Sequence, residues 1–141
     1  RGYKRYQDAG GASPHHLHQW RKRVKYLWYH HRLLKQTWPK VYKAYAKEIK
    51  QLSDYLGDHH DLDLLDQKVQ ELYQDGMPTE SAQVLHALCQ EQKINLEVKA
   101  LQLGQRIYAE KPDDFRSRHK AYLKAGLYAE KYEITPAEFH A

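Results

Sequence analysis

Basic side chains and a histidine recur at helical spacing between residues 14 and 37. We call this set the basic stripe, and it comprises His18, Arg21, Lys22, Lys25, Tyr29 and Arg32. On a helix that turns by about 100° per residue, these positions share one arc, and neighbouring turns place side chains about 5–6 Å apart. Guanidinium, ammonium and protonated imidazole groups bind phosphate and carboxylate oxygens through charge-assisted hydrogen bonds. The spacing therefore predicts a linear site for anionic groups.

The same helix carries a separate apolar arc, which predicts its core face. That arc comprises Leu17, Trp20, Val24, Leu27, Trp28, His31 and Leu34. We expect His31 to be a hydrogen-bonded interior histidine and His30 to face solvent. Residues 14–37 contain no Asp or Glu. Because like charges on neighbouring turns repel by roughly 0.2–0.5 kcal/mol per pair, negative charge must come from outside this helix.

Three sources of that negative charge are open. The first is a set of carboxylates on another helix, for which the candidates are Asp54, Asp58, Asp61 and Asp63. The second is solvent alone, and the third is an external polyanion. Residues 1–50 hold 13 Lys and Arg against two acids, a net of +11, so the remainder of the chain carries −6 of the total of +5. This asymmetry fits a polyanionic partner or pairing between helices, and total charge does not choose between them.

The elements that position the stripe are all expected to be helices. Apolar residues recur every three or four positions, and no strand alternation, repeat or low-complexity run occurs. The helices are predicted over 14–37, over 41–72 with a kink or break near Gly57, over 79–111 and over 113–131, after a helix end at 1–8. Ser13 and Thr79 are the expected N-caps. We predict an all-α, antiparallel four-helix-type bundle over residues 1–131, followed by a tail over 132–141.

Composition narrows the class of protein. The single cysteine, Cys89, excludes a disulfide within the chain and suits a small core residue in a reducing compartment. No apolar run is long enough to cross a bilayer and no signal-peptide pattern occurs, so an intracellular, cytoplasmic protein without a membrane partner is expected. Because the sequence begins at Arg1 rather than Met, we expect it to be excised from a longer chain. No nucleophile triad, glycine-rich phosphate loop or cysteine metal cluster occurs, so neither catalysis, a metal nor a cofactor is expected.

Three ordered blocks of the sequence resemble one known family. They are LHQWRKRVKYLWY at residues 17–29, YLGDHHDLDLL at 55–65 and ALQLGQRIYAEKPDDFRSR at 100–118. Together they resemble the CHAD family, the histidine-containing α-helical domain. The resemblance implies a helical bundle that binds inorganic polyphosphate, without catalysis, through a basic surface. The resemblance also implies that complete members consist of two related four-helix bundles, which face each other across a basic channel. This chain resembles the C-terminal bundle.

The resemblance also implies which residues bind the polymer. The family's role carries over to His18, Arg21, Lys22 and Lys25. Arg106 follows from the last block, while Arg1 and Arg5 would extend the surface from the preceding helix. Trp28 stands where the family usually has another Arg. The implied partners are polyphosphate, an associated phosphate-processing domain or a second CHAD-like half, and the implied location includes polyphosphate granules.

Two other functions are consistent with parts of the sequence. Tyr26, Tyr29 and Trp20 lie among the cations, as in a nucleic-acid-binding module that stacks bases, although core packing explains most of the tyrosines better. The segment DHHDLD at residues 58–63 contains a His-Asp dipeptide, as in metal-dependent His-Asp phosphohydrolases. There the alternative is that Asp58 or Asp61 caps a helix that begins after Gly57.

Overall fold

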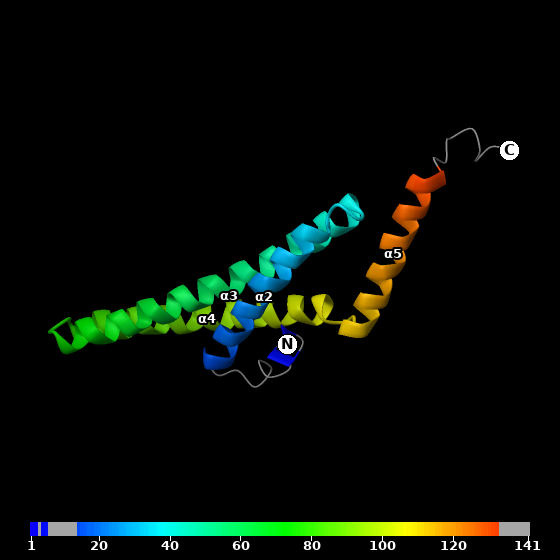
Figure 1. Cartoon of the computed structure of the whole chain (residues 1–141). Helices are drawn as coiled ribbons and strands as arrows, with labels where there is room; N and C mark the ends of the chain where they lie inside the picture. Colours follow the sequence, from blue (N-terminus) through cyan, green and yellow to red (C-terminus); the bar gives the residue numbers. More distant parts are fainter. Residues whose placement is uncertain (3, 6–13, 133–141) are drawn as a thin grey trace.

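The computed structural model describes residues 1–2, 4–5 and 14–132, and the regular structure in those residues is helical (Figure 1). Its helices are α2 (Pro14–Leu34), α3 (Pro39–Gln74), α4 (Thr79–Ile107) and α5 (Pro112–Tyr132). The predicted all-α fold is confirmed. Gly2, Lys4 and Arg5 are also helical. The rest of the predicted first helix, the Ser13 N-cap and the tail over 133–141 lie outside the described residues.

Prolines and one glycine set the helix boundaries. Pro39 and Pro112 occupy the first positions of α3 and α5, where the missing amide proton is not needed. Gly76 adopts φ of 105° in the turn between α3 and α4, a conformation that side chains with a Cβ avoid. The predicted N-cap at Thr79 is wrong by one position, because Pro78 is the cap residue and Thr79 is already helical.

Helix α3 continues through Gly57 without interruption. The break that the sequence left open there does not occur, while a kink within one helix stays a prediction. Asp58 and Asp61 therefore lie inside the helix and cap nothing. A Cβ at Gly57 would lie 3.8 Å from Nε of Arg21 on α2, an ordinary van der Waals contact, so Arg21 packs directly over this position.

Helices α3 and α4 form a long antiparallel hairpin, and α2 lies across its base, where α3 begins and α4 ends (Figure 1). Helix α5 extends away from that base. The main core joins α2, α3 and α4, and its buried residues are Leu17, Trp20, Val24, Ile49, Leu52, Leu56, Ala100 and Tyr108. The apolar arc predicted for α2 thus faces the other two helices. This packing leaves the opposite arcs of α2 at the surface.

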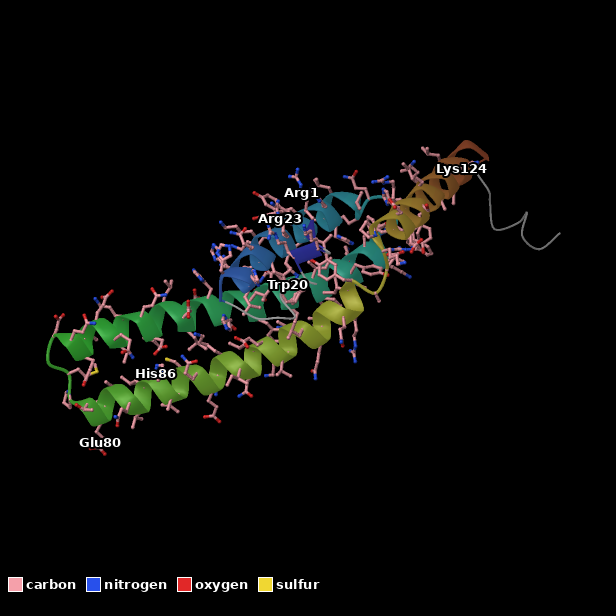
Figure 2. The ribbon with its side chains drawn as sticks, turned by 90° about the horizontal axis from the view of Figure 1, so that it is seen from below. Arg1, Trp20, Arg23, Glu80, His86 and Lys124 are labelled. Atoms are coloured by element: carbon pink, nitrogen blue, oxygen red, sulfur yellow. The ribbon has the colours of Figure 1, made fainter. Side chains whose placement is uncertain are left out.

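Beyond α2, polar contacts connect the two arms of the hairpin. His59 Nε2 lies 2.8 Å from a Glu97 carboxylate oxygen, and Lys93 Nζ donates to Asp63 at 2.7 Å. This contact with Lys93 holds the pKa of the Asp63 carboxyl below its usual value. His86, labelled between the arms in Figure 2, lies 2.7 Å from an Asp66 oxygen. In this outer part of the hairpin, Leu65, Leu72, Leu85 and Leu88 are exposed.

His31 fixes the junction between α2, α3 and α5. Its ring is only 4% exposed, and its Nδ1 lies 2.9 Å from the carbonyl oxygen of Leu27. The ring centroid lies 5.3 Å from that of Phe115 on α5, and Tyr42 Oη is hydrogen bonded to His119 Nδ1 at 2.6 Å. Burial lowers the pKa of His31 and so favours the neutral imidazole. The prediction of an interior histidine is confirmed.

None of the helices in the described part of the chain combines the length and apolar character that crossing a membrane requires.

Candidate anion-binding site

The two arcs of α2 separate in the structure as their patterns predict. On the apolar arc, Trp20 and Val24 are fully buried. On the basic stripe, Lys22, Lys25, Tyr29 and Arg32 are exposed, whereas His18 and Arg21 are partly buried against the neighbouring helix. The core contacts of the apolar arc therefore fix the rotation of α2 about its own axis, and this keeps the stripe at the surface beside α3.

A groove of about 350 Å³ runs between the stripe and α3. We call it the stripe groove, and it is lined by Arg21, Lys25, Trp28 and Tyr29 from α2 and by Lys50, Ser53, Asp54, Gly57, Asp58 and Asp61 from α3. The Nε atom of Arg21 is buried and has no hydrogen-bond partner among the described residues. Arg21 thus lies over Gly57 with donor capacity that the rest of the described protein leaves unused.

The carboxylates of α3 form no ion pair with the stripe in the described residues. Asp54 pairs with Lys50 on its own helix, and Asp63 pairs with Lys93 of α4. Asp58 and Asp61 line the stripe groove, but neither is within 4.0 Å of a cation in the described residues. Across the same residues, no ion pair is formed by Arg21, Lys22, Lys25 or Arg32. Pairing with another helix, the first source of compensating charge, is therefore absent at these four cations.

His18 is the titratable group of the stripe. Its ring centroid lies 5.0 Å from that of His60 on α3, with an angle of 39° between the ring planes. Burial lowers the pKa of His18, and the nearby charges of Lys22, His60 and Arg21 lower it further. Its buried Nδ1 has no hydrogen-bond partner among the described residues. A bound anion would stabilise the protonated form that these neighbours disfavour.

A second hollow, of about 330 Å³, lies where α2 ends and α3 begins. We call it the corner pocket, and it is lined by Trp28, Arg32, Lys35, Tyr42, Lys43, Ala46, Lys47 and Lys50. The Arg32 guanidinium stacks over the Trp28 ring, 4.9 Å from its centroid. Sequence reasoning missed these lysines of α3, although their spacing of four and three residues, with Glu48 the only acid in residues 39–53, was a visible signal.

The remaining predicted binding residues do not join the stripe. Arg1 lines a different cavity of about 630 Å³ with Arg23 and Tyr26, on the other flank of α2, and Figure 2 shows Arg1 beside Arg23. Arg5 is partly buried, and its backbone N–H donates to the Arg1 carbonyl oxygen at 3.1 Å. Arg106 is exposed near the end of α4, and it lines neither the stripe groove nor the corner pocket. The structure thus keeps the six stripe residues together on α2, and neither Arg1 nor Arg106 lines the stripe groove or the corner pocket.

The residues behind the two alternative functions are also placed. Trp20 is buried as expected, but Tyr26 and Tyr29 are 57% and 52% exposed, so core packing does not explain these two tyrosines. In the segment 58–63, the side chains diverge around α3: His60 contacts His18, Asp63 pairs with Lys93, and Asp58 and Asp61 face the stripe groove. In the part of the chain that the structure describes, no three His, Cys, Asp or Glu side chains are grouped to hold a metal ion.

Comparison with known proteins assigns the family. Residues 1–70, which include all of α2 and most of α3, match the model of the CHAD domain. No curated protein and no solved structure matches the chain significantly. The matched region carries the basic stripe, the stripe groove and the corner pocket, and on the strength of this match the chain belongs to the CHAD family.

Proposed function

We propose that this chain binds inorganic polyphosphate, without catalysis, along the basic stripe of α2. The observation that carries the proposal is the lack of an ion pair at Arg21, Lys22, Lys25 and Arg32 within the described residues, although three carboxylates line the adjoining groove. Cations held on one surface without an ion-pair partner favour a polyanion from outside. Membership of the CHAD family, which is associated with polyphosphate, supports the same ligand.

The shape of the stripe suits a linear polymer of phosphates. From His18 to Arg32 the helix rises by roughly 21 Å, at about 1.5 Å per residue. Polyphosphate has no bases to read, so it requires a row of charges rather than a set of base-specific contacts. Arg21, whose Nε has no hydrogen-bond partner among the described residues, lies near the His18 end of that row. The stripe can therefore engage successive phosphates on neighbouring turns.

Titration calorimetry with long-chain polyphosphate at two salt concentrations tests the proposal. Because binding neutralises several phosphates and releases their counterions, we expect the affinity to fall steeply as salt rises. Heparin and single-stranded DNA and RNA, used as competitors, should displace polyphosphate poorly. Incubation with Mg²⁺ or Mn²⁺ should release no phosphate. Failure of the polymer to bind, or its hydrolysis, would contradict the proposal.

Nucleic acid is the second candidate ligand because Tyr26 and Tyr29 are exposed beside the cations. Aromatic rings on a basic surface stack unpaired bases, and each stacked base contributes about 1–3 kcal/mol. The competition experiment separates the two ligands. Single strands that displace polyphosphate at lower concentration than heparin would favour nucleic acid and overturn our choice.

In the intact protein, we propose that this domain tethers the chain to a polyphosphate store or passes the polymer to an associated phosphate-processing domain. A second CHAD-like half facing the stripe would enclose the polymer between two basic surfaces. We propose that such a protein would lie in the cytoplasm, at polyphosphate granules, where its ligand is stored. The stripe supports these roles because four of its six side chains, Lys22, Lys25, Tyr29 and Arg32, are exposed.

Protonation of His18 should tighten binding at lower pH. The free imidazole has a lowered pKa because of burial and of Lys22, His60 and Arg21, and an anion beside it must raise that pKa. Binding therefore takes up a proton, and the affinity should rise as the pH falls from 8 to 6. Internal phosphates of the polymer stay ionised over this range. Calorimetry in two buffers of different ionisation enthalpy measures the proton uptake.

The control for this pH effect is His86→Gln, in the outer hairpin. It should keep the pH dependence of binding, whereas His18→Gln should reduce it. A flat affinity from pH 8 to 6 in the parent protein would show that His18 does not act as a cation.

A further inference from the structure

The corner pocket has a different charge balance from the stripe groove. Five basic side chains line it, namely Arg32, Lys35, Lys43, Lys47 and Lys50, and no carboxylate does. Lys50 shares its charge with Asp54, while the other four have no ion pair among the described residues. The stripe groove instead combines three cations with three carboxylates and is formally neutral. The positive potential is therefore concentrated in the corner pocket.

This concentration of charge is set by the packing of two helices. Lys43, Lys47 and Lys50 share one face of α3, since they are four and three residues apart. Arg32 and Lys35 approach that face from the end of α2. The core contacts of His31 and Tyr42 hold the two helices together at this point. Mutual repulsion of the cations is thus maintained by the fold, and a bound anion would relieve it.

The two hollows adjoin each other, because Trp28 and Lys50 line both. The Arg32 guanidinium lies over the Trp28 ring, so its face is covered by the indole and its N–H edges stay available. That geometry orients the bidentate edge of Arg32 for phosphate oxygens. A chain lying along the stripe reaches the corner pocket by passing Trp28.

We infer that the corner pocket is a distinct phosphate-binding site that anchors the polymer where it leaves the stripe. The inference rests on the proposed function and adds to it that the polymer runs from the stripe toward the corner pocket. Short oligophosphates bind in the corner pocket alone, because the neutral stripe groove attracts them weakly. Long chains occupy the pocket and the stripe together.

The test compares three double variants of the same chain against tripolyphosphate and long-chain polyphosphate. Lys43→Gln with Lys47→Gln removes charge from the corner pocket, and Arg21→Gln with Lys25→Gln removes it from the stripe groove. The matched control is Lys99→Gln with Lys124→Gln, which removes two exposed charges that line none of the described hollows. Glutamine keeps the helix propensity of lysine, so helicity should not change.

We call the Lys43→Gln and Lys47→Gln protein the corner variant and the Arg21→Gln and Lys25→Gln protein the stripe variant. We expect the corner variant to lose about tenfold or more in affinity for both ligands. The stripe variant should lose affinity for the long chain only, and the control should resemble the parent. Acetylation of surface lysines, read by mass spectrometry, should show Lys43 and Lys47 protected by tripolyphosphate and Lys99 unprotected.

The outcomes separate this inference from the proposed function. A corner variant that binds both ligands as the control does, with Lys43 and Lys47 unprotected, overturns the inference and leaves the stripe as the site. Loss of binding in the corner variant alone, with the stripe variant unchanged, supports the inference and contradicts the role of the stripe. A parent protein that binds neither ligand overturns both.

Discussion

Replacing Arg21 and Lys25 together by glutamate should abolish the binding of polyphosphate along the stripe. The two side chains line the stripe groove one helical turn apart, and neither has an ion pair within the described residues. Each charged hydrogen bond contributes about 1.5–3 kcal/mol, so loss of two contacts weakens binding by roughly 10²–10⁴-fold. Reversal adds repulsion from Asp58 and Asp61 to that loss. Calorimetry measures the affinity, and circular dichroism shows whether the helices persist.

A matched reversal at Lys99 and Lys124 distinguishes the site from total charge. Both side chains are exposed and lie on α4 and α5, and Figure 2 labels Lys124 far from the stripe. This control changes the net charge by the same amount. We expect its affinity for polyphosphate to fall by less than about threefold at moderate salt, because distant charges are screened. Equal losses in the two reversed proteins, or full binding by the Arg21 and Lys25 variant, would contradict the stripe as the binding site.

Trp20→Ala should be the most destabilising single change in the described core. The indole is fully buried between α2, α3 and α4, and its centroid lies 6.3 Å from that of Tyr108. Removing a large buried aromatic side chain costs about 3–5 kcal/mol through lost transfer free energy and the cavity left behind. That is a large share of the roughly 5–15 kcal/mol by which native domains are stable. Urea denaturation followed by circular dichroism measures the loss.

Trp38→Ala provides the comparison for that experiment. Trp38 is 45% exposed, and its ring packs edge-to-face on Tyr122, with centroids 4.8 Å apart. The expected loss is about 1 kcal/mol. If both variants lost the same free energy of unfolding, α2 would not be anchored through Trp20.

The helical pattern was sufficient to predict the two arcs of α2. Trp20 and Val24 fall on one arc and Lys22 and Lys25 on another, because a period of 3.6 residues separates faces regardless of what packs on them. His31 was assigned to the interior on the same basis. These predictions depend only on rotation about one helix axis, which the sequence determines.

Features that depend on two helices were harder to predict. The ion-pair partners of Asp54 and Asp63 depend on how the helices are placed against one another. In the structure, Asp54 pairs with Lys50 and Asp63 pairs with Lys93, and neither cation belongs to the stripe. The shift of the apolar pattern at Gly57 suggested a break, yet one continuous helix accommodates it, with Arg21 lying over the glycine. The spacing of Lys43 and Lys47 was visible in the sequence, but the position of the end of α2 against them was not, because it depends on how the two helices pack.

The uneven distribution of the core has a consequence for how the protein meets its ligand. Large buried side chains such as Trp20, Ile49 and Leu52 lie at the base of the hairpin. In its outer part, ion pairs connect the two arms and several leucine side chains are exposed. Local stability follows buried apolar contacts, so opening fluctuations start at the tip and fade toward the base. The cation-bearing surfaces lie on the stiff end. The binding surface is therefore preorganised for a polymer, and little of the binding free energy is needed to order the backbone.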